Sequence, residues 1–157
     1  RTFVTSLYQP LLDALQSGTK SIILIEPTGW ARVDRNVEKI VHSLETAKDE
    51  EDFQSVGFLC RETIISLAQA VYDQDKHGSP DGVTISDTDA KRILDSYIAH
   101  GLRGDSFDEH RRFARAAYDL ANKVQHRRTA NFPDAALCAE ATRSLINIIA
   151  IISGQRD

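Results

Sequence analysis

The stretch that decides the fold is residues 106–153, SFDEHRRFARAAYDLANKVQHRRTANFPDAALCAEATRSLINIIAIIS. It divides at residues 126–133, HRRTANFP, into two segments that both have the spacing of helices. Ser106 and Glu109 match a capping box, in which two side chains satisfy free N–H groups at a helix start. Pro133 opens the second segment, and proline is favoured in a first helical turn because its missing N–H would have no partner there. Two helices joined by a short basic loop are therefore predicted.

The first helix of this pair is predicted to be amphipathic, because residues three or four apart share a helical face. The residues of its inner face are Phe113, Ala116, Ala117, Leu120 and Val124. The residues of its outer face are Arg112, Arg115, Asp119, Asn122 and His126. We therefore expect one buried apolar face and one solvent-exposed polar face on this helix. The chain's concentrated positive charge lies where this helix ends.

The second helix is apolar on almost every side. It ends in LINIIAII at residues 145–152, and Gly154 is a natural stop because glycine adopts the left-handed conformation that ends many helices. With so little polar face, this helix is expected to be buried nearly all round. A strand is the competing interpretation of the Ile-rich end, since β-branched residues favour strands. The unbroken Ala-rich lead-in favours the helix.

Length and composition indicate one globular domain. The chain has 157 residues, of which 41% are hydrophobic and 27% are charged, which suits one soluble domain. The net charge of -4 argues against a dedicated nucleic-acid binder, although a local basic patch is compatible with it. No run of about 18 apolar residues and no signal peptide is visible, so no membrane span and no membrane partner are expected.

The two cysteines and the first residue bear on compartment and context. Cys60 and Cys138 fall on apolar helical faces, so buried free thiols in a reducing cytoplasm are expected. Two cysteines make no metal-site pattern, and neither a metal nor a cofactor is expected. The chain begins at Arg1 and contains no Met, which favours a piece of a longer polypeptide with other domains.

The remaining segments predict further helices. An N-terminal helix at residues 1–17 precedes an extended arm at residues 21–26. Apolar residues at helical spacing then predict helices at residues 34–48, 53–75 and 86–98. The fold class predicted from all these segments is all-α.

One domain, residues 1–157, is predicted to enclose these helices as a bundle. Its core is a four-helix unit of two hairpins at residues 53–153, and the N-terminal helices and the arm at residues 1–50 pack on it. Gly57 lies on the apolar stripe of the central helix, which indicates close approach of another helix. Asp34, and Ser86 with Asp89, are the predicted N-terminal caps of the second and fourth helices.

The end of the chain resembles a known family. A long helix ending in the step Asn122-x-x-x-His126, a short basic loop and a small-residue apolar helix resemble the second hairpin of HEPN domains. These are compact helical modules of prokaryotic defence and toxin systems. The family's motif is Arg-x(4–6)-His, often with Asn directly after the Arg, and in active members it is similar to a metal-independent RNA-cleaving site formed across a dimer. Asn122 and His126 match the motif, whereas Ala121 stands at the position of its Arg.

The candidate site residues follow from this resemblance. The candidate catalytic residues are His126, Asn122 and Arg127. The candidate binding residues are Arg61, Arg112, Arg115, Lys123 and Arg128. Histidine exchanges protons near neutral pH and arginine stabilises charge that develops on phosphate. Arg127, Arg128 and Arg61 are the candidate substitutes for the guanidinium lacking at Ala121. A homodimer and an RNA or nucleotide ligand are implied as partners.

Two other places satisfy the spacing of the motif. Arg35 and Asn36 precede His42, and Arg103 precedes His110. A chain with this many Arg and His residues produces such matches by chance, so they carry little information.

Three functions remain open from the sequence. The first is a non-catalytic HEPN-like module that dimerises and binds RNA or a nucleotide in a phage-defence (abortive infection) or toxin–antitoxin protein, and Ala121 favours it. The second is a metal-independent RNA endonuclease that uses His126 with a substitute arginine. The third is a purely structural helical interaction domain, in which Arg111, Arg112 and Arg115 only pair with Asp108 and Asp119 on a solvated helix face.

Overall fold

The structure is a computed structural model, and it describes Pro10 and residues 26–156. These residues form helices and no strand, which confirms the all-α prediction for this part of the chain. The elements in order are α2 (Ala31–Thr46), α3 (Glu50–Val71), α4 (Gln74–His77), α5 (Ala90–Gly101), the short 3-10 helix η1 (Asp105–Phe107), α6 (Asp108–His126) and α7 (Phe132–Ser153). The helix predicted at residues 1–17 and most of the predicted arm lie outside the described residues.

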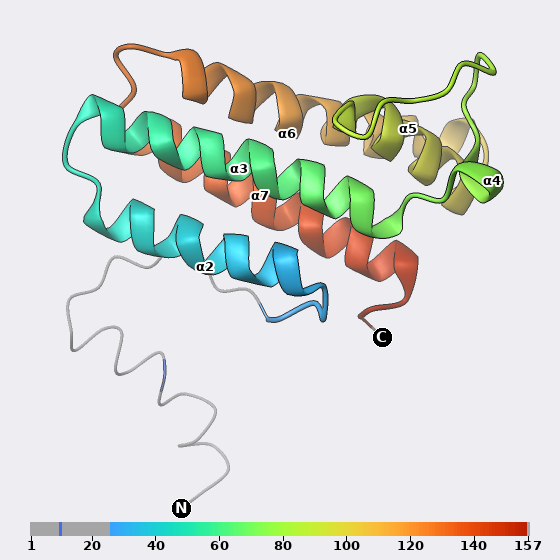
Figure 1. Ribbon diagram of the computed structural model, residues 1–157, viewed down its shortest axis with the longest axis horizontal. Coiled ribbons are helices and arrows are strands. Elements are labelled where there is room, and N and C mark those ends of the chain that lie inside the picture. The colour runs from blue at the N-terminus through green and yellow to red at the C-terminus, as the bar shows by residue number, and fades with distance from the viewer. Residues whose placement is uncertain (1–9, 11–25, 157) are drawn as a thin grey trace, which may run out of the picture.

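Helix α3 is the centre of the bundle and contacts α2, α5, α6 and α7 (Figure 1). Its apolar stripe explains this position, because Val56, Cys60, Ile64 and Leu67 recur every three or four residues and are all fully buried. The buried residues of the other helices join this stripe in one continuous core. The prediction of a single helical bundle around a central helix therefore agrees with the described residues.

Two hairpins of the bundle have their turns at one end. The short connections from α2 to α3 and from α6 to α7 lie at the same end of the bundle, and α4 and α5 lie at the other (Figure 1). Gln54 near the start of α3 joins the two turns, because its Nε2 donates a hydrogen bond to the carbonyl of Arg127 at 2.7 Å. Phe53 and Phe132 pack edge to face at this end, with ring centroids 6.5 Å apart.

Several helix starts differ from the predictions. The prediction of a capping box at Ser106 is wrong, because residues 105–107 form the tighter turn η1 and α6 begins at Asp108 without a side-chain cap. The Ser86 capping box is also wrong, since α5 begins at Ala90 with Asp89 as its cap. The Ser86 hydroxyl instead accepts a hydrogen bond from Thr88 N at 3.5 Å, while Ser106 lies within η1.

Asp34 caps a turn and not a helix. Helix α2 begins three residues before Asp34, and the Asp34 carboxylate accepts hydrogen bonds from Thr28 N at 2.8 Å, Thr28 Oγ1 at 2.8 Å and Gly29 N at 3.0 Å. The predicted helix 53–75 is also divided, because α3 ends at Val71 and Asp73 caps the separate turn α4. Polar side chains thus set both boundaries through local hydrogen bonds.

The buried stripe of α6 is rotated from the predicted one. Ala117 and Val124 are buried as predicted, whereas Ala116 is exposed and Phe113 and Leu120 are half-buried. Small residues replace the large ones on the inner face, which consists of Ala114, Ala117, Ala121 and Val124. Alanines on this face let the α6 backbone approach α3, and Gly57 on α3 continues that close contact as predicted, since a Cβ built there would lie 2.6 Å from Gln125 N.

Helix α7 is a helix throughout, as predicted, but it is not buried nearly all round. Leu137 and Ile151 are 65% and 63% exposed, because α3, α6 and the ends of α2 and α5 cover only part of its circumference. Within the described residues α7 is also the helix long and apolar enough to cross a membrane by length and composition, with 44% of its apolar window buried. Its packing against α3 and α6 accounts for its apolar character as that of a core helix.

Candidate functional site

The end of α6 presents four of the predicted site residues to solvent. Asn122, Lys123, His126 and Arg128 are all exposed. Within residues 26–156 their side chains have neither a hydrogen-bond partner nor an ion-pair partner. These side chains are therefore free to meet a ligand, but nothing positions them with respect to one another.

Arg127 is held by the first turn of α7. Its Nη1 lies 2.9 Å from Asp134 Oδ1, while Asp134 Oδ2 accepts a hydrogen bond from Asn131 N at 3.1 Å. Asn131 Oδ1 in turn accepts from Asp134 N at 3.0 Å, which completes a capping box at the start of α7. The Arg127 guanidinium thus stabilises the α6–α7 turn and has an acidic partner in place of a phosphate.

Ala121, at the position of the motif's Arg, lies in the core. Its exposed fraction is 0%, and it faces α3 on the inner side of α6. Asn122 and His126 lie on the opposite, solvated side. A guanidinium at position 121 would therefore be buried between two helices, where an unpaired charge is very costly.

Arg61 does not reach His126. Its Nη1 pairs with Glu62 Oε1 at 3.0 Å, and its guanidinium carbon lies 6.0 Å from the centre of the Tyr118 ring. Tyr118 precedes His126 by eight residues on α6, which corresponds to about 12 Å along a helix. The structure therefore does not bring the Arg61 guanidinium to the histidine.

The arginines near the start of α6 are paired with acidic residues. Arg111 and Arg112 pair with Asp108 at 3.4 and 2.7 Å, and Arg115 pairs with Asp95 of α5 at 2.7 Å. Asp119 pairs with Lys91, and not with an arginine of its own helix. These ion pairs agree with the interpretation of α6 as a solvated, salt-bridged helix face, and two of them connect α6 to α5.

The acidic group at residues 49–52 lies at the same end of the bundle as His126 and Arg128, beside the α6–α7 turn (Figure 1). Asp49 Oδ1 accepts a hydrogen bond from Asp52 N, and Asp52 Oδ2 accepts one from Lys48 N, both at 2.9 Å. This group caps α3, where negative charge is favoured. The charge at this end is consequently mixed, and the basic residues do not form an uninterrupted positive patch.

The two other matches to the motif's spacing do not form sites either. Arg35 and His42 are exposed on α2, and no contact joins their side chains. His42 lies beside the apolar stripe of α2, but its side chain is exposed and is not packed in the core. Arg103 is exposed after α5. His110 packs edge to face on Phe107 with ring centroids 5.4 Å apart, and its buried Nδ1 has no hydrogen-bond partner in the described residues.

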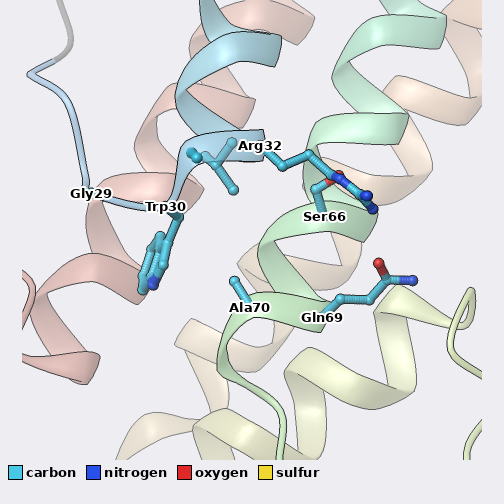
Figure 2. A pocket seen from close by; sticks show the side chains of 8 residues that line it. Gly29, Trp30, Arg32, Ser66, Gln69 and Ala70 are labelled. Atoms are coloured by element: carbon cyan, nitrogen blue, oxygen red, sulfur yellow. The ribbon is translucent and has the colours of Figure 1, made fainter.

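A hollow of about 420 Å³ lies between the start of α2 and the end of α3 (Figure 2). Trp30 stands on one side of it, and Arg32 reaches across α3 above Ser66 on the other. Gln69 also lines it and is held in place, because its Nε2 donates a hydrogen bond to the carbonyl of Asp87 at 2.9 Å. No acidic or imidazole group lines this hollow, so it offers a binding surface but no general acid or base.

A second hollow, between the turn after α4 and the end of α5, collects polar groups that sequence reasoning missed. His77 and His100 line it with Ser96 and Arg103. No sequence motif joins these residues, because two turns and a loop separate them along the chain. Only the packing of α4 against α5 brings them together.

Comparison of the chain with family models, with curated proteins and with solved structures found no match. The all-α bundle therefore rests on the packing of this chain's own helices, and the resemblance to HEPN domains remains a prediction for residues 53–153.

Proposed function

We propose that this chain is a non-catalytic, HEPN-like helical module that pairs with a second copy of itself and binds RNA or a nucleotide weakly at the end of α6. The resemblance makes a phage-defence or toxin–antitoxin protein its setting. The observation that carries the proposal is the burial of Ala121 at the contact of α6 with α3. His126 consequently has no guanidinium at the position that the motif assigns to it for stabilising phosphate charge, and Arg127 beside it is paired with Asp134.

The exposed face of α7 supports pairing. Leu137, Ala141, Ser144, Ile148 and Ile151 follow one another at alternating spacings of four and three residues and are at least partly exposed. That spacing is the seam of a coiled coil, in which apolar side chains of one helix enter gaps of its partner. In an antiparallel pair centred on Ser144, Leu137 of one copy meets Ile151 of the other. The small residues at the centre favour close approach.

Binding at the end of α6 is supported by its free donors. Lys123, His126 and Arg128 carry or can acquire positive charge, and Asn122 supplies an amide. The acidic residues 49–52 beside them reduce the local positive potential. Weak, salt-dependent binding of phosphate groups is the expected result.

The test of pairing is the mass in solution, measured by light scattering over a wide range of concentrations. Leu137→Glu and Ile151→Glu should convert a dimer into a monomer, because each places a charge in the seam. Val83→Glu is the matched control, since Val83 is 57% exposed but lies on a loop away from α7, and it should leave the dimer intact. A wild-type protein that stays monomeric at the highest concentration would refute the pairing.

The test of catalysis is an RNA-cleavage assay without metal, with the wild type and its His126→Ala variant side by side. No cleavage is expected from either protein, whereas Lys123→Gln and Arg128→Gln should weaken RNA retention at low salt. Cleavage that disappears in the His126→Ala variant would instead establish the metal-independent endonuclease. Unchanged RNA retention in both charge variants would leave pairing as the only function.

A further inference from the structure

The hollow between the turn after α4 and the end of α5 has the composition of an anion site. Its volume is about 400 Å³, and it is lined by His77, Ser79, Ser96, His100 and Arg103 among others. No carboxylate lines it. A volume of this order is at the lower end of the range of small-molecule sites.

His77 is oriented so that it can donate a hydrogen bond. Its Nδ1 accepts the backbone N–H of Asp73 at 2.8 Å, so the hydrogen of the neutral ring is on Nε2. The ring packs edge to face on Tyr97 and on His100, each with centroids 5.0 Å apart. These three contacts fix the imidazole, and its free nitrogen is a donor.

Three other donors of the hollow, Ser96, His100 and Arg103, have no side-chain hydrogen-bond partners within residues 26–156, whereas Ser79 is bonded to Asp81. Ser96 is 3% exposed, and its Oγ is buried without a hydrogen bond, although a buried hydroxyl normally has one. Arg103 and His100 form no ion pair with another described residue. A guanidinium, two imidazoles and an unsatisfied hydroxyl therefore line one hollow, from α4, from α5 and from the segment after α5.

The wall opposite α5 is held firmly. Arg92 Nη2 lies 2.7 and 2.9 Å from the two carboxylate oxygens of Asp81, and Ser79 Oγ donates to Asp81 Oδ1 at 2.5 Å. Tyr72 donates its hydroxyl to the carbonyl of Gly78 at 2.9 Å. Because these bonds fix residues 78–82 against α3 and α5, the hollow is preformed and binding costs little ordering of the chain.

We propose that this hollow binds a small phosphate-bearing molecule, with Arg103 and His100 on the charged oxygens and His77 Nε2–H and Ser96 Oγ–H as further donors. The C-terminal end of α5 carries about half a negative charge from the helix dipole, which disfavours an anion there. The full charge of Arg103 outweighs it, and charge-assisted hydrogen bonds to phosphate are the strong ones. This site is distinct from the end of α6 and does not depend on pairing or on RNA.

The experiment is a titration of the full chain with inorganic phosphate and with a nucleoside 5′-monophosphate, followed by NMR of the histidine rings, with the uncharged nucleoside as the ligand control. Both phosphates should shift the ring signals of His77 and His100, and the nucleoside should not. Arg103→Gln should lower the affinity at least about tenfold, as expected when one charged contact to phosphate is lost. Ser96→Ala should lower it by a smaller factor.

Arg112→Gln is the matched control, because Arg112 is an exposed arginine of α6 paired with Asp108 and should not affect phosphate binding. Arg128→Gln should weaken RNA retention at the end of α6 and leave the phosphate-dependent shifts of the His77 and His100 rings unchanged, so each site is tested separately. Absence of ring shifts at millimolar phosphate in a folded protein would overturn the proposal. Shifts that persist with equal affinity in Arg103→Gln would overturn it as well.

Discussion

Gly57 is the residue on which the contact of α3 with α6 depends. A Cβ at this position would lie 2.6 Å from Gln125 N and 2.8 Å from Val124 Cγ1, so the backbone of α6 itself would have to move. Gly57→Ala should therefore lower the free energy of unfolding by about 1–3 kcal/mol, the usual cost of overpacking, although alanine favours helices by about 1 kcal/mol over glycine. Urea unfolding followed by circular dichroism measures this difference.

Gly101 provides the comparison for that substitution. A Cβ there would lie 2.8 Å from Ile152 Cγ2, which is the movable end of a side chain. Gly101→Ala should cost clearly less than Gly57→Ala. An equal cost at both positions would contradict the assignment of Gly57 to a rigid backbone contact.

His77 makes stability depend on pH. Burial and the neighbouring His100, with a smaller effect of Lys76, lower the pKa of His77 from its usual value, while Asp73 opposes them. Protonation therefore favours the unfolded chain. The stability that neutral His77 supplies is fully present above about pH 6.5, the usual histidine value, and is lost as the pH falls through the lower folded pKa.

The check is a comparison of the wild type with His77→Gln, unfolded by urea at several pH values. The difference in free energy of unfolding between the two proteins should shrink as the pH is lowered from neutral towards 5. A difference that stays constant or grows over this range would show that protonation of His77 does not destabilise the folded protein.

Helix α7 owes its start to a capping box that also anchors Arg127. Asn131→Ala should cost about 1 kcal/mol of stability, the usual value of an N-cap. Asp134→Ala should cost more, because it removes both the bond to Asn131 N and the partner of Arg127. Denaturant unfolding of both variants measures the two costs.

Ser106→Ala is the control for these caps. Ser106 matches a capping box in the sequence, but α6 begins at Asp108 without a side-chain cap. Its replacement should change stability by less than about 0.5 kcal/mol, as surface substitutions usually do. A cost as large as that of Asn131→Ala would mean that Ser106 does cap the helix in solution.

The reactivity of the two thiols tests whether the bundle unfolds as one cooperative unit. Cys60 of α3 and Cys138 of α7 are free and fully buried, as predicted, and a hydrogen bond with Cys60 together with burial raises the pKa of the Cys138 thiol. Both should be protected from thiol reagents in the native protein and react only through unfolding. The labelling rate in increasing urea should therefore follow the global unfolding transition.

A cysteine placed at Val83 gives the reference rate, because this loop residue is 57% exposed. Val83→Cys should react at once under native conditions. Reaction of Cys60 or Cys138 well below the unfolding transition would show that α3 and α7 separate locally.

The predictions succeeded where a periodic pattern was long. The stripe of α3 and the unbroken apolar run of α7 each span several turns, so both helices were predicted correctly, although α7 is less buried than expected and the stripe of α6 is rotated. They failed where short polar patterns decided a boundary, as at Ser106 and Ser86. A single hydroxyl has several local backbone partners, and spacing does not distinguish among them.

The sequence by itself determined that residues 26–156 are mainly helical, that α3 is central, and that Pro133 and Gly154 lie at the ends of α7, because local hydrogen bonding and hydrophobic periodicity act within each helix. Only the tertiary structure decided that Ala121 is buried, that Arg61 and Arg127 are held by acidic partners, and that His77, Ser96, His100 and Arg103 share one hollow. The reason is geometric. A helical pattern shows which residues share a face, but the rotation of that face and its neighbours depend on how closely the other helices pack.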